Sequence, residues 1–183
     1  GGNAMLVRAG ALHHDIGKLA IPIFFIENQN TGFNPHNELS YEESAQTIIS
    51  HVTNGIKLAY KHSLPEPIID FIRTHHGTSK TKYFYNRYVA ENPDKPIDST
   101  IFTYKGPRPF SRETAVVMMV DAVEAASRSL KNHSESEISK LVDNIINSQI
   151  EDEQFSNSDI TFKDVDKIKD LLKKKLQSIY HVR

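Results

Sequence analysis

The stretch His13-His14-Asp15-Ile16-Gly17-Lys18 follows an apolar run, residues 4–12, near the start of the chain. A histidine beside an aspartate at the end of a short helix offers a nitrogen and an oxygen ligand from adjacent positions, and this pair suits a divalent transition metal. Gly17 would allow a tight turn behind the pair. Lys18 would place a cation within one turn of it, where a phosphate needs one. Because His-Asp pairs also occur by chance on surfaces, the metal site depends on further ligands elsewhere.

The bulk composition is that of an ordinary globular domain. The chain has 183 residues, of which 38% are hydrophobic and 25% charged, with a formal net charge of −1. This length is enough for one domain with a substantial core. The near-neutral charge argues against a polymeric nucleic acid as a partner. There are no cysteines, so any metal must be bound by histidines and carboxylates, and no apolar run approaches the length of a membrane span.

Apolar spacing and capping residues predict an all-α chain without strands. The predicted helices cover residues 5–13, 40–53, 54–62, 65–76, 80–92, 111–130, 134–146 and 161–179. Ser40 with Glu43 and Ser134 with Glu137 have the spacing of capping boxes, and Gly77 is a natural helix stop. Segments 27–39, 93–110 and 151–158 have loop composition. In the last helix, the predicted buried face carries Val165, Ile168, Leu172 and Ile179.

Several histidines and one aspartate interrupt or end these apolar helices. The lone carboxylate of Asp121 would be costly to bury without a partner, and metal coordination would account for it. Together with the opening pair there are six candidate ligands: His14, Asp15, His51, His75, His76 and Asp121. Four imidazoles and two carboxylates suit two ions such as Fe, Mn or Zn better than Mg or Ca. Asp15 is the natural bridge, because its neighbour His14 ties it to one ion while the second lies alongside.

Each candidate also has a structural alternative. His75 and His76 could be exposed histidines favoured by the dipole at a helix C-terminus, and His51 could be a hydrogen-bonded core residue. Asp121 could pair with Arg128, seven residues further along the same helix face. The other histidines are assigned to surface or structural roles: His13, His36, His62, His133 and His181.

Seven short motifs follow one another in a defined order: His14-Asp15-Ile16-Gly17-Lys18, Phe24-Phe25-Ile26-Glu27-Asn28-Gln29, Asn34-Pro35-His36, Ser50-His51-Val52, His75-His76-Gly77-Thr78, Gly106-Pro107-Arg108-Pro109 and Val120-Asp121-Ala122-Val123-Glu124-Ala125-Ala126. This order resembles the HD phosphohydrolase superfamily, and within it the cytoplasmic HD domain of the seven-transmembrane HD receptors. The resemblance covers residues 9–130. The related HD-GYP family, which cleaves cyclic di-GMP, has a Gly-Tyr-Pro motif where this chain has Gly77-Thr78-Ser79.

The resemblance implies a fold and an activity. The fold would be one HD-domain helical bundle over residues 1–183. The activity would be hydrolysis of cyclic di-AMP to linear pApA with two divalent transition metals, Fe or Mn. In that family a further histidine ligand precedes the His-Asp pair on an upstream helix, so the domain would lack one ligand without it. The parent protein would be a bacterial inner-membrane protein that carries this domain in the cytoplasm.

The resemblance also implies residue roles. His14, Asp15 and Asp121 would serve one metal, and Asp15, His51, His75 and His76 the other. Two ions would activate water for attack on phosphorus, with Asp15 and Lys18 as the catalytic residues. From the residue types and their positions, and not from the resemblance, the expected substrate contacts are Lys18, Thr78 and Arg128.

Some of these roles stay open. Thr78 could instead cap a helix, and Arg128 could instead pair with Asp121 or Glu124. Tyr104 or Arg108 in the long loop could contact a base. Two other functions also remain: a phosphohydrolase acting on another nucleotide, and a sensor that binds a cyclic dinucleotide without cleaving it.

Overall fold

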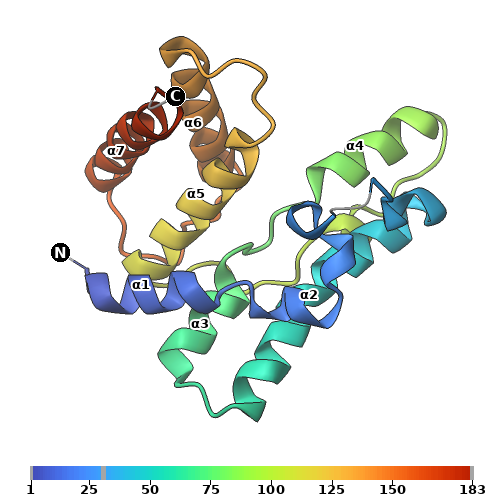
Figure 1. Cartoon of the computed structure of the whole chain (residues 1–183), viewed down its shortest axis with the longest axis horizontal. Coiled ribbons are helices and arrows are strands. Elements are labelled where there is room, and N and C mark those ends of the chain that lie inside the picture. The colour runs from blue at the N-terminus through green and yellow to red at the C-terminus, as the bar shows by residue number, and fades with distance from the viewer. Residues whose placement is uncertain (1, 30–31, 182–183) are drawn as a thin grey trace.

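The computed structural model describes residues 2–29 and 32–181, and the regular elements in these ranges are helices joined by turns and loops (Figure 1). In chain order the elements are α1 (Ala4–His13), η1 (Ile16–Ala20), η2 (Pro22–Phe24), η3 (Ile26–Asn28), η4 (Pro35–Glu38), α2 (Tyr41–Lys61), α3 (Glu66–Thr74), α4 (Lys82–Glu91), η5 (Ser99–Phe102), α5 (Arg112–Ser127), α6 (Glu135–Glu151) and α7 (Phe162–His181), where η marks a 3-10 helix. Within the described ranges the only β-type pairing is one bridge between Lys80 and Thr103. The predicted all-α class is confirmed.

Helices α2 and α6 start at the two predicted capping residues, Ser40 and Ser134. Ser40 accepts a hydrogen bond from the backbone amide of Glu43 and its own amide donates to the Glu43 carboxylate, so the box at the start of α2 is complete. At α6, Ser134 accepts from the amide of Glu137, but the Glu137 carboxylate pairs with Lys140 at 3.1 Å. The second predicted capping box is therefore only half formed.

The two helices predicted over residues 40–53 and 54–62 are one continuous helix, α2, so the predicted break was wrong. Gly55 lies inside this helix despite the low helix propensity of glycine. Its role is packing: a Cβ added there would lie 2.8 Å from Cγ2 of Ile72 in α3. His51 consequently lies in the middle of α2, and helical turns on both sides hold its backbone.

The helices divide into two groups that α1 joins (Figure 1). Helices α5, α6 and α7 lie together at one end, while α4 and the 3-10 segments lie at the other. The core of the first group consists of Ala115, Met118, Met119, Val123, Ile138, Val142, Ile146, Phe155, Val165 and Leu176. Helix α1 packs against both α3 and α5. The site described below lies where α1, α2, α3 and α5 come together.

The buried face of α7 differs from the prediction near its end. Val165 is buried, but Ile179 is 64% exposed, and Leu176 and Tyr180 pack on the core instead. Spacing alone does not account for this difference, because position 179 lies three residues after 176 and within the same helical stripe as 165, 168, 172 and 176.

Segment η1 crosses α2 very closely at Gly17. A Cβ added to Gly17 would overlap the carbonyl oxygen of His51 and the backbone nitrogen of Gly55. The φ angle of Gly17 is not among the positive ones, so the predicted tight turn is not the reason for this glycine. It is required for the close approach of two backbones, which brings Asp15 beside His51. Among the described helices, none is long and apolar enough to cross a bilayer.

Candidate metal centre

The structure brings the six predicted ligands together from four parts of the chain. They come from the end of α1 (His14, Asp15), the middle of α2 (His51), the end of α3 (His75, His76) and α5 (Asp121). The donor atoms of five of them form two overlapping groups, each within 4.8 Å: His51, His75 and His76 in one, and His14, Asp15 and His75 in the other. Asp121 joins the second group through His14, at 3.3 Å. His51 and His75 are each 1% exposed, so the alternative of a helix-end histidine in solvent is wrong for His75.

His51 and His75 face each other through their Nε2 atoms, which are 3.0 Å apart. The Nδ1 of His51 lies 2.6 Å from the carbonyl oxygen of Ile48, and that of His75 lies 2.9 Å from the carbonyl oxygen of Ile72. Because a carbonyl only accepts, each Nδ1 carries a proton, and the neutral form of either ring would have its lone pair on Nε2. Two lone pairs at this distance repel unless a positive species, a proton or a metal ion, is bound between them.

Asp15 lies between the two groups of donors. Its Oδ1 is 3.4 Å from Nε2 of His51 and 3.6 Å from Nε2 of His75. Its Oδ2 is 3.3 Å from Nε2 of His14 and 2.7 Å from Nζ of Lys18. The two oxygens therefore point toward different ligand sets, as a carboxylate that bridges two ions would.

Asp121 pairs with His14 rather than with Arg128. Its Oδ1 is 3.3 Å from Nε2 of His14, whose Nδ1 lies 2.8 Å from the carbonyl oxygen of Ala11. Arg128 forms an ion pair with Glu124 at 2.9 Å on the exposed side of α5. The alternative in which Arg128 neutralises Asp121 is wrong, while its pairing with Glu124 is present.

The electrostatics of this cluster distinguish His14 from His51 and His76. Burial disfavours the charged form of His14, but its hydrogen bonds with Asp121 and Asp15 outweigh burial and raise its pKa to about 10. Burial would likewise raise the pKa of Asp15, but the hydrogen bond from His14 holds it well below its usual range. Burial, reinforced by His75, lowers the pKa of His51 to about 4 and that of His76 well below its usual value. His51 and His76 thus offer lone pairs at neutral pH.

Metal binding at His14 should therefore release a proton. Since its pKa is about 10, His14 is protonated at neutral pH, and an ion must displace that proton. We expect the apparent association constant of this ion to rise about tenfold per pH unit between roughly pH 6 and 8. Calorimetry in buffers of different ionisation enthalpy measures the proton release. In His14→Asn the pH dependence should become shallower, and an affinity that is independent of pH in the parent domain would contradict the expectation.

Lys18 lies at the edge of the cluster between two carboxylates. Its Nζ is 2.7 Å from Oδ2 of Asp15 and 2.7 Å from Oε1 of Glu27, and it lies 5.1 Å from the ring centre of Phe25. Burial opposes its charge, but Asp15 and Glu27 outweigh burial and raise its pKa. Sequence reasoning did not single out Glu27 as a site residue, although it belongs to the quoted motif that starts at Phe24.

Thr78 holds the turn that follows His76. Its amide donates to Oε1 of Gln154 at 2.9 Å, and its hydroxyl accepts from Nε2 of Gln154 and Nε of Arg108. Gly77 ends this segment at a φ of 50°, as the predicted helix stop requires. Gln154 is 2% exposed, although it belongs to the segment predicted as a polar loop. Its role was not visible in sequence, because 76 residues separate it from Thr78.

The histidines predicted to have surface or structural roles do not belong to the cluster. Of these, His13, His36, His62 and His133 lie in the described part of the chain, and the side chain of His181 lies outside it. His36 donates from Nε2 to the carbonyl oxygen of Phe24 at 3.0 Å and lines a cavity with residues of α4.

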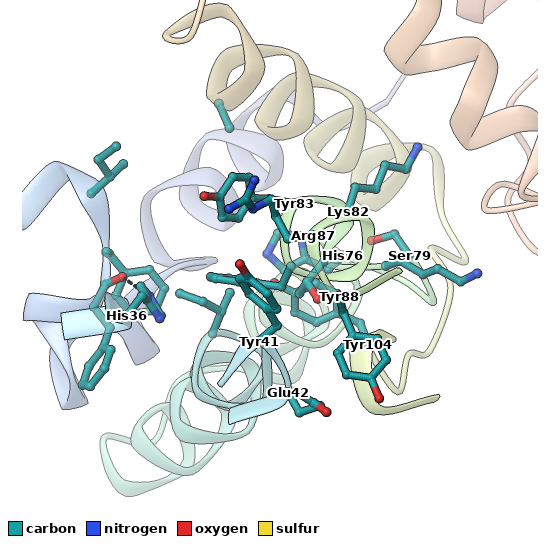
Figure 2. Close-up of a pocket in the computed structure, with 18 of the residues that line it drawn as sticks. His36, Tyr41, Glu42, His76, Ser79, Lys82, Tyr83, Arg87, Tyr88 and Tyr104 are labelled. Carbon is teal, nitrogen blue, oxygen red and sulfur yellow. Dashed lines mark hydrogen bonds between the residues drawn. The ribbon is translucent and has the colours of Figure 1, made fainter. Parts of the chain in front are cut away.

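Two cavities meet at the cluster. The larger has a volume of about 1410 Å³, and the smaller, about 320 Å³, contains Lys18 and Arg128 in its wall. Figure 2 shows part of the larger cavity, with His36 well apart from Tyr83 and Arg87 of α4. The residues common to both cavities are Ile26, Glu27, Asp121 and Ala125. A ligand that reaches the cluster can therefore extend in two directions.

The family model of the HD domain matches residues 1–126. The chain belongs to the HD domain family. HD domains are metal-dependent, and the cluster gives this one a suitable donor set. The predicted HD-domain helical bundle is confirmed by its similarity to the crystal structure of the Listeria monocytogenes phosphodiesterase PgpH HD domain in complex with cyclic-di-AMP. The TM-score is 0.93 at 40% identity, covering 98% of this chain and 83% of that chain.

This HD domain is also similar to parts of longer proteins. It is 43% identical over 183 residues to cyclic-di-AMP phosphodiesterase PgpH of Bacillus subtilis, of which it covers 26%. It is 40% identical over 183 residues to cyclic-di-AMP phosphodiesterase PgpH of Listeria monocytogenes, of which it covers 25%. The chain thus spans about a quarter of the length of these curated relatives.

Proposed function

We propose that this HD domain is the catalytic domain of a phosphodiesterase that hydrolyses cyclic di-AMP to linear pApA. The reaction class is supported by one observation above all: the Nε2 atoms of His51 and His75 converge on the carboxylate of Asp15, which also faces His14. The substrate is supported by the relatives named as cyclic-di-AMP phosphodiesterases and by the similar domain in complex with cyclic-di-AMP.

The donor set fits two metals, for which we propose Fe or Mn. His14, Asp15 and Asp121 would hold one ion, and Asp15, His51, His75 and His76 the other, with Asp15 common to both. Imidazole and carboxylate ligands in these numbers suit such transition metals. When bound, the ions would polarise a phosphoryl group and make a water molecule more acidic. The first set has three ligand residues, which leaves a position for a further ligand such as the upstream histidine that the family resemblance implies.

We propose that Lys18 and Arg128 bind the phosphates of the substrate. Both line the smaller cavity, and each is now paired with a carboxylate, Lys18 with Glu27 and Arg128 with Glu124. A phosphate in this cavity could exchange with these carboxylates, because it offers oxygens of the same charge to the same donors. Lys18 is placed to offset charge on the non-bridging oxygens, since it already lies beside Asp15. For Thr78, a phosphate contact requires exchange of its present hydrogen bond with Arg108.

The larger cavity has the size and chemistry to take the nucleoside parts of a dinucleotide. Its volume of about 1410 Å³ exceeds the roughly 300–1,000 Å³ of an ordinary small-molecule site. Aromatic side chains in its wall, such as Tyr83 and Tyr88 (Figure 2), are suited to contact bases.

A nucleotide panel tests this proposal. The metal-loaded domain, alone and within the full-length parent, is incubated with cyclic di-AMP, cyclic di-GMP, a guanosine alarmone and a nucleoside triphosphate, and products are separated by chromatography. We expect pApA from cyclic di-AMP and at least about tenfold slower turnover of the others, a difference of about 1.4 kcal/mol in transition-state binding. Faster turnover of another nucleotide would show that the domain is a phosphohydrolase with a different substrate. Binding of cyclic di-AMP without product from either protein would indicate a sensor domain.

We also infer that the parent protein is anchored in a bacterial inner membrane, with this domain on the cytoplasmic side. The inference rests on the resemblance to seven-transmembrane HD receptors and is consistent with relatives about four times as long as this chain. Fractionation of cells that express the full-length protein, followed by protease accessibility, tests it.

A further inference from the structure

One of the four clustered imidazoles, that of His76, lacks the hydrogen bond that holds each of the other three. In three of them, Nδ1 is hydrogen-bonded to the carbonyl oxygen three residues earlier in the chain: His14 to Ala11, His51 to Ile48 and His75 to Ile72. Such bonds hold a metal-ligating ring in place and select its tautomer. For His76, no hydrogen bond of either ring nitrogen is present among the residues that the structure describes. Another contact must therefore hold its ring.

The ring of Tyr104 covers the ring of His76. The two ring centres are 4.2 Å apart and the planes are inclined by only 28°, so the rings are stacked. The other aromatic neighbours of His76 present edges or inclined planes: His75 at 4.0 Å and 45°, and His51 at 5.1 Å and 86°. Tyr104 is 7% exposed, so its own position is set by packing. Rotation of the imidazole about its Cβ–Cγ bond would drive its edge into the Tyr104 ring.

The backbone explains how Tyr104 reaches this position. The amide of Tyr104 donates to the carbonyl oxygen of Ser79 at 2.9 Å, and the amide of Thr81 donates to that of Phe102 at 2.8 Å. These bonds flank the bridge between Lys80 and Thr103. The segment that follows His76 thus pairs with residues 102–104, and this pairing returns Tyr104 to the ligand turn. Both His76 and Tyr104 reach the larger cavity shown in Figure 2.

We infer that Tyr104 is a positioning residue for His76: its ring face orients the imidazole where the other ligands use a carbonyl oxygen. The inference rests on the proposed dinuclear centre and assigns a role to a residue outside the ligand set. Stacking restrains the ring while leaving both nitrogens free of protein hydrogen bonds, so Nε2 or Nδ1 can bind an ion. The restraint requires the aromatic face and not the phenolic hydroxyl.

Metal titration of variants tests this role without relying on catalysis. Tyr104→Phe keeps the ring, while Tyr104→Leu and Tyr104→Met fill the space without a flat face. The metal-free proteins are titrated with Co²⁺, whose visible absorption reports ligand geometry. We expect Tyr104→Phe to bind both ions with affinities within about threefold of those of the unsubstituted domain. In Tyr104→Leu and Tyr104→Met, one ion should bind about 10–100-fold more weakly, the range typical of lost second-shell partners, and the other should be little changed.

Phe102→Leu is the matched control. Phe102 lies two residues from Tyr104 in the same paired segment and is 1% exposed, but its ring packs on Tyr85 and Tyr88. Its replacement removes a similar amount of buried aromatic surface, so it should lower the thermal midpoint about as much as Tyr104→Leu. Its affinity for both ions should match that of the parent. All titrations are made well below the midpoint of each variant.

Several outcomes would overturn the inference. Unchanged binding of both ions by Tyr104→Leu or Tyr104→Met would show that the stack does not position His76. An equal loss in Tyr104→Phe would assign the effect to the hydroxyl, and an equal loss in Phe102→Leu would assign it to general packing. If the unsubstituted domain binds no Co²⁺ at all, both the proposed dinuclear centre and this inference are wrong. If the unsubstituted domain binds two ions and hydrolyses cyclic di-AMP, and Tyr104→Leu binds the ions equally well, the proposed function stands and only the role of Tyr104 is wrong.

Discussion

Replacing Asp15 by alanine is expected to abolish metal binding and turnover together. Asp15 faces His14 with one oxygen and His51 with the other, so its loss removes the shared ligand of both proposed ions. Loss of their Lewis acidity costs several kcal/mol in the transition state, which corresponds to a rate reduction of roughly a thousandfold or more. Metal content by elemental analysis and hydrolysis of cyclic di-AMP are measured on the same sample.

Two control variants test whether the loss of metal in Asp15→Ala is due to the missing carboxylate of Asp15. Asp15→Asn keeps the size of the side chain and one oxygen but removes the charge, so it should fold and still lose most of the metal. Asp70→Ala removes a carboxylate of similar exposure that pairs with Arg73 at 3.3 Å outside the cluster, and it should retain both ions. Retention of two ions by Asp15→Ala would contradict the proposed bridge, and normal turnover without metal would contradict the reaction mechanism.

Replacing Gly17 by alanine is expected to have the largest effect on stability. The added Cβ would overlap the backbone of α2 at His51 and Gly55, and a backbone cannot move aside as a side chain can. Overpacking of this kind costs about 3 kcal/mol or more of unfolding free energy, measured by urea denaturation of the metal-free protein. Because relief of the overlap separates Asp15 from His51, metal affinity should fall as well.

Gly55→Ala, at the same crossing, is the comparison for the loss of stability in Gly17→Ala. Its Cβ would lie 2.8 Å from Cγ2 of the buried Ile72 and 3.2 Å from the backbone nitrogen of Gly17, contacts that are less close than those of a Cβ at Gly17. Alanine also gains up to about 1 kcal/mol over glycine inside a helix, so the loss of stability should be smaller than in Gly17→Ala. Similar losses in both variants would show that the overlap with the backbone at Gly17 does not dominate the cost. A stable Gly17→Ala variant would contradict the argument for close approach.

Local signals were enough for much of the helical structure. The capping residues at Ser40 and the stop at Gly77 predicted helix ends correctly, because a cap depends on hydrogen bonds and φ angles within a few residues. The same locality explains the errors. A break was predicted between residues 53 and 54, yet α2 continues through this point and through Gly55, which packs against α3. Ile179 was assigned to the core from its spacing, although its side chain is exposed and the next residue, Tyr180, packs on the core.

The chemical identity of the candidate site could be deduced from sequence, whereas its geometry could not. Histidines and carboxylates that interrupt apolar helices are costly to bury, so their type and order already indicate metal binding. Three features depend on contacts between segments far apart in the chain: the crossing at Gly17, the stacking of Tyr104 on His76 and the hydrogen bonds of Gln154 to the ligand turn. Residue types and local spacing carry no information about such distances, because they arise only when the helices pack against one another.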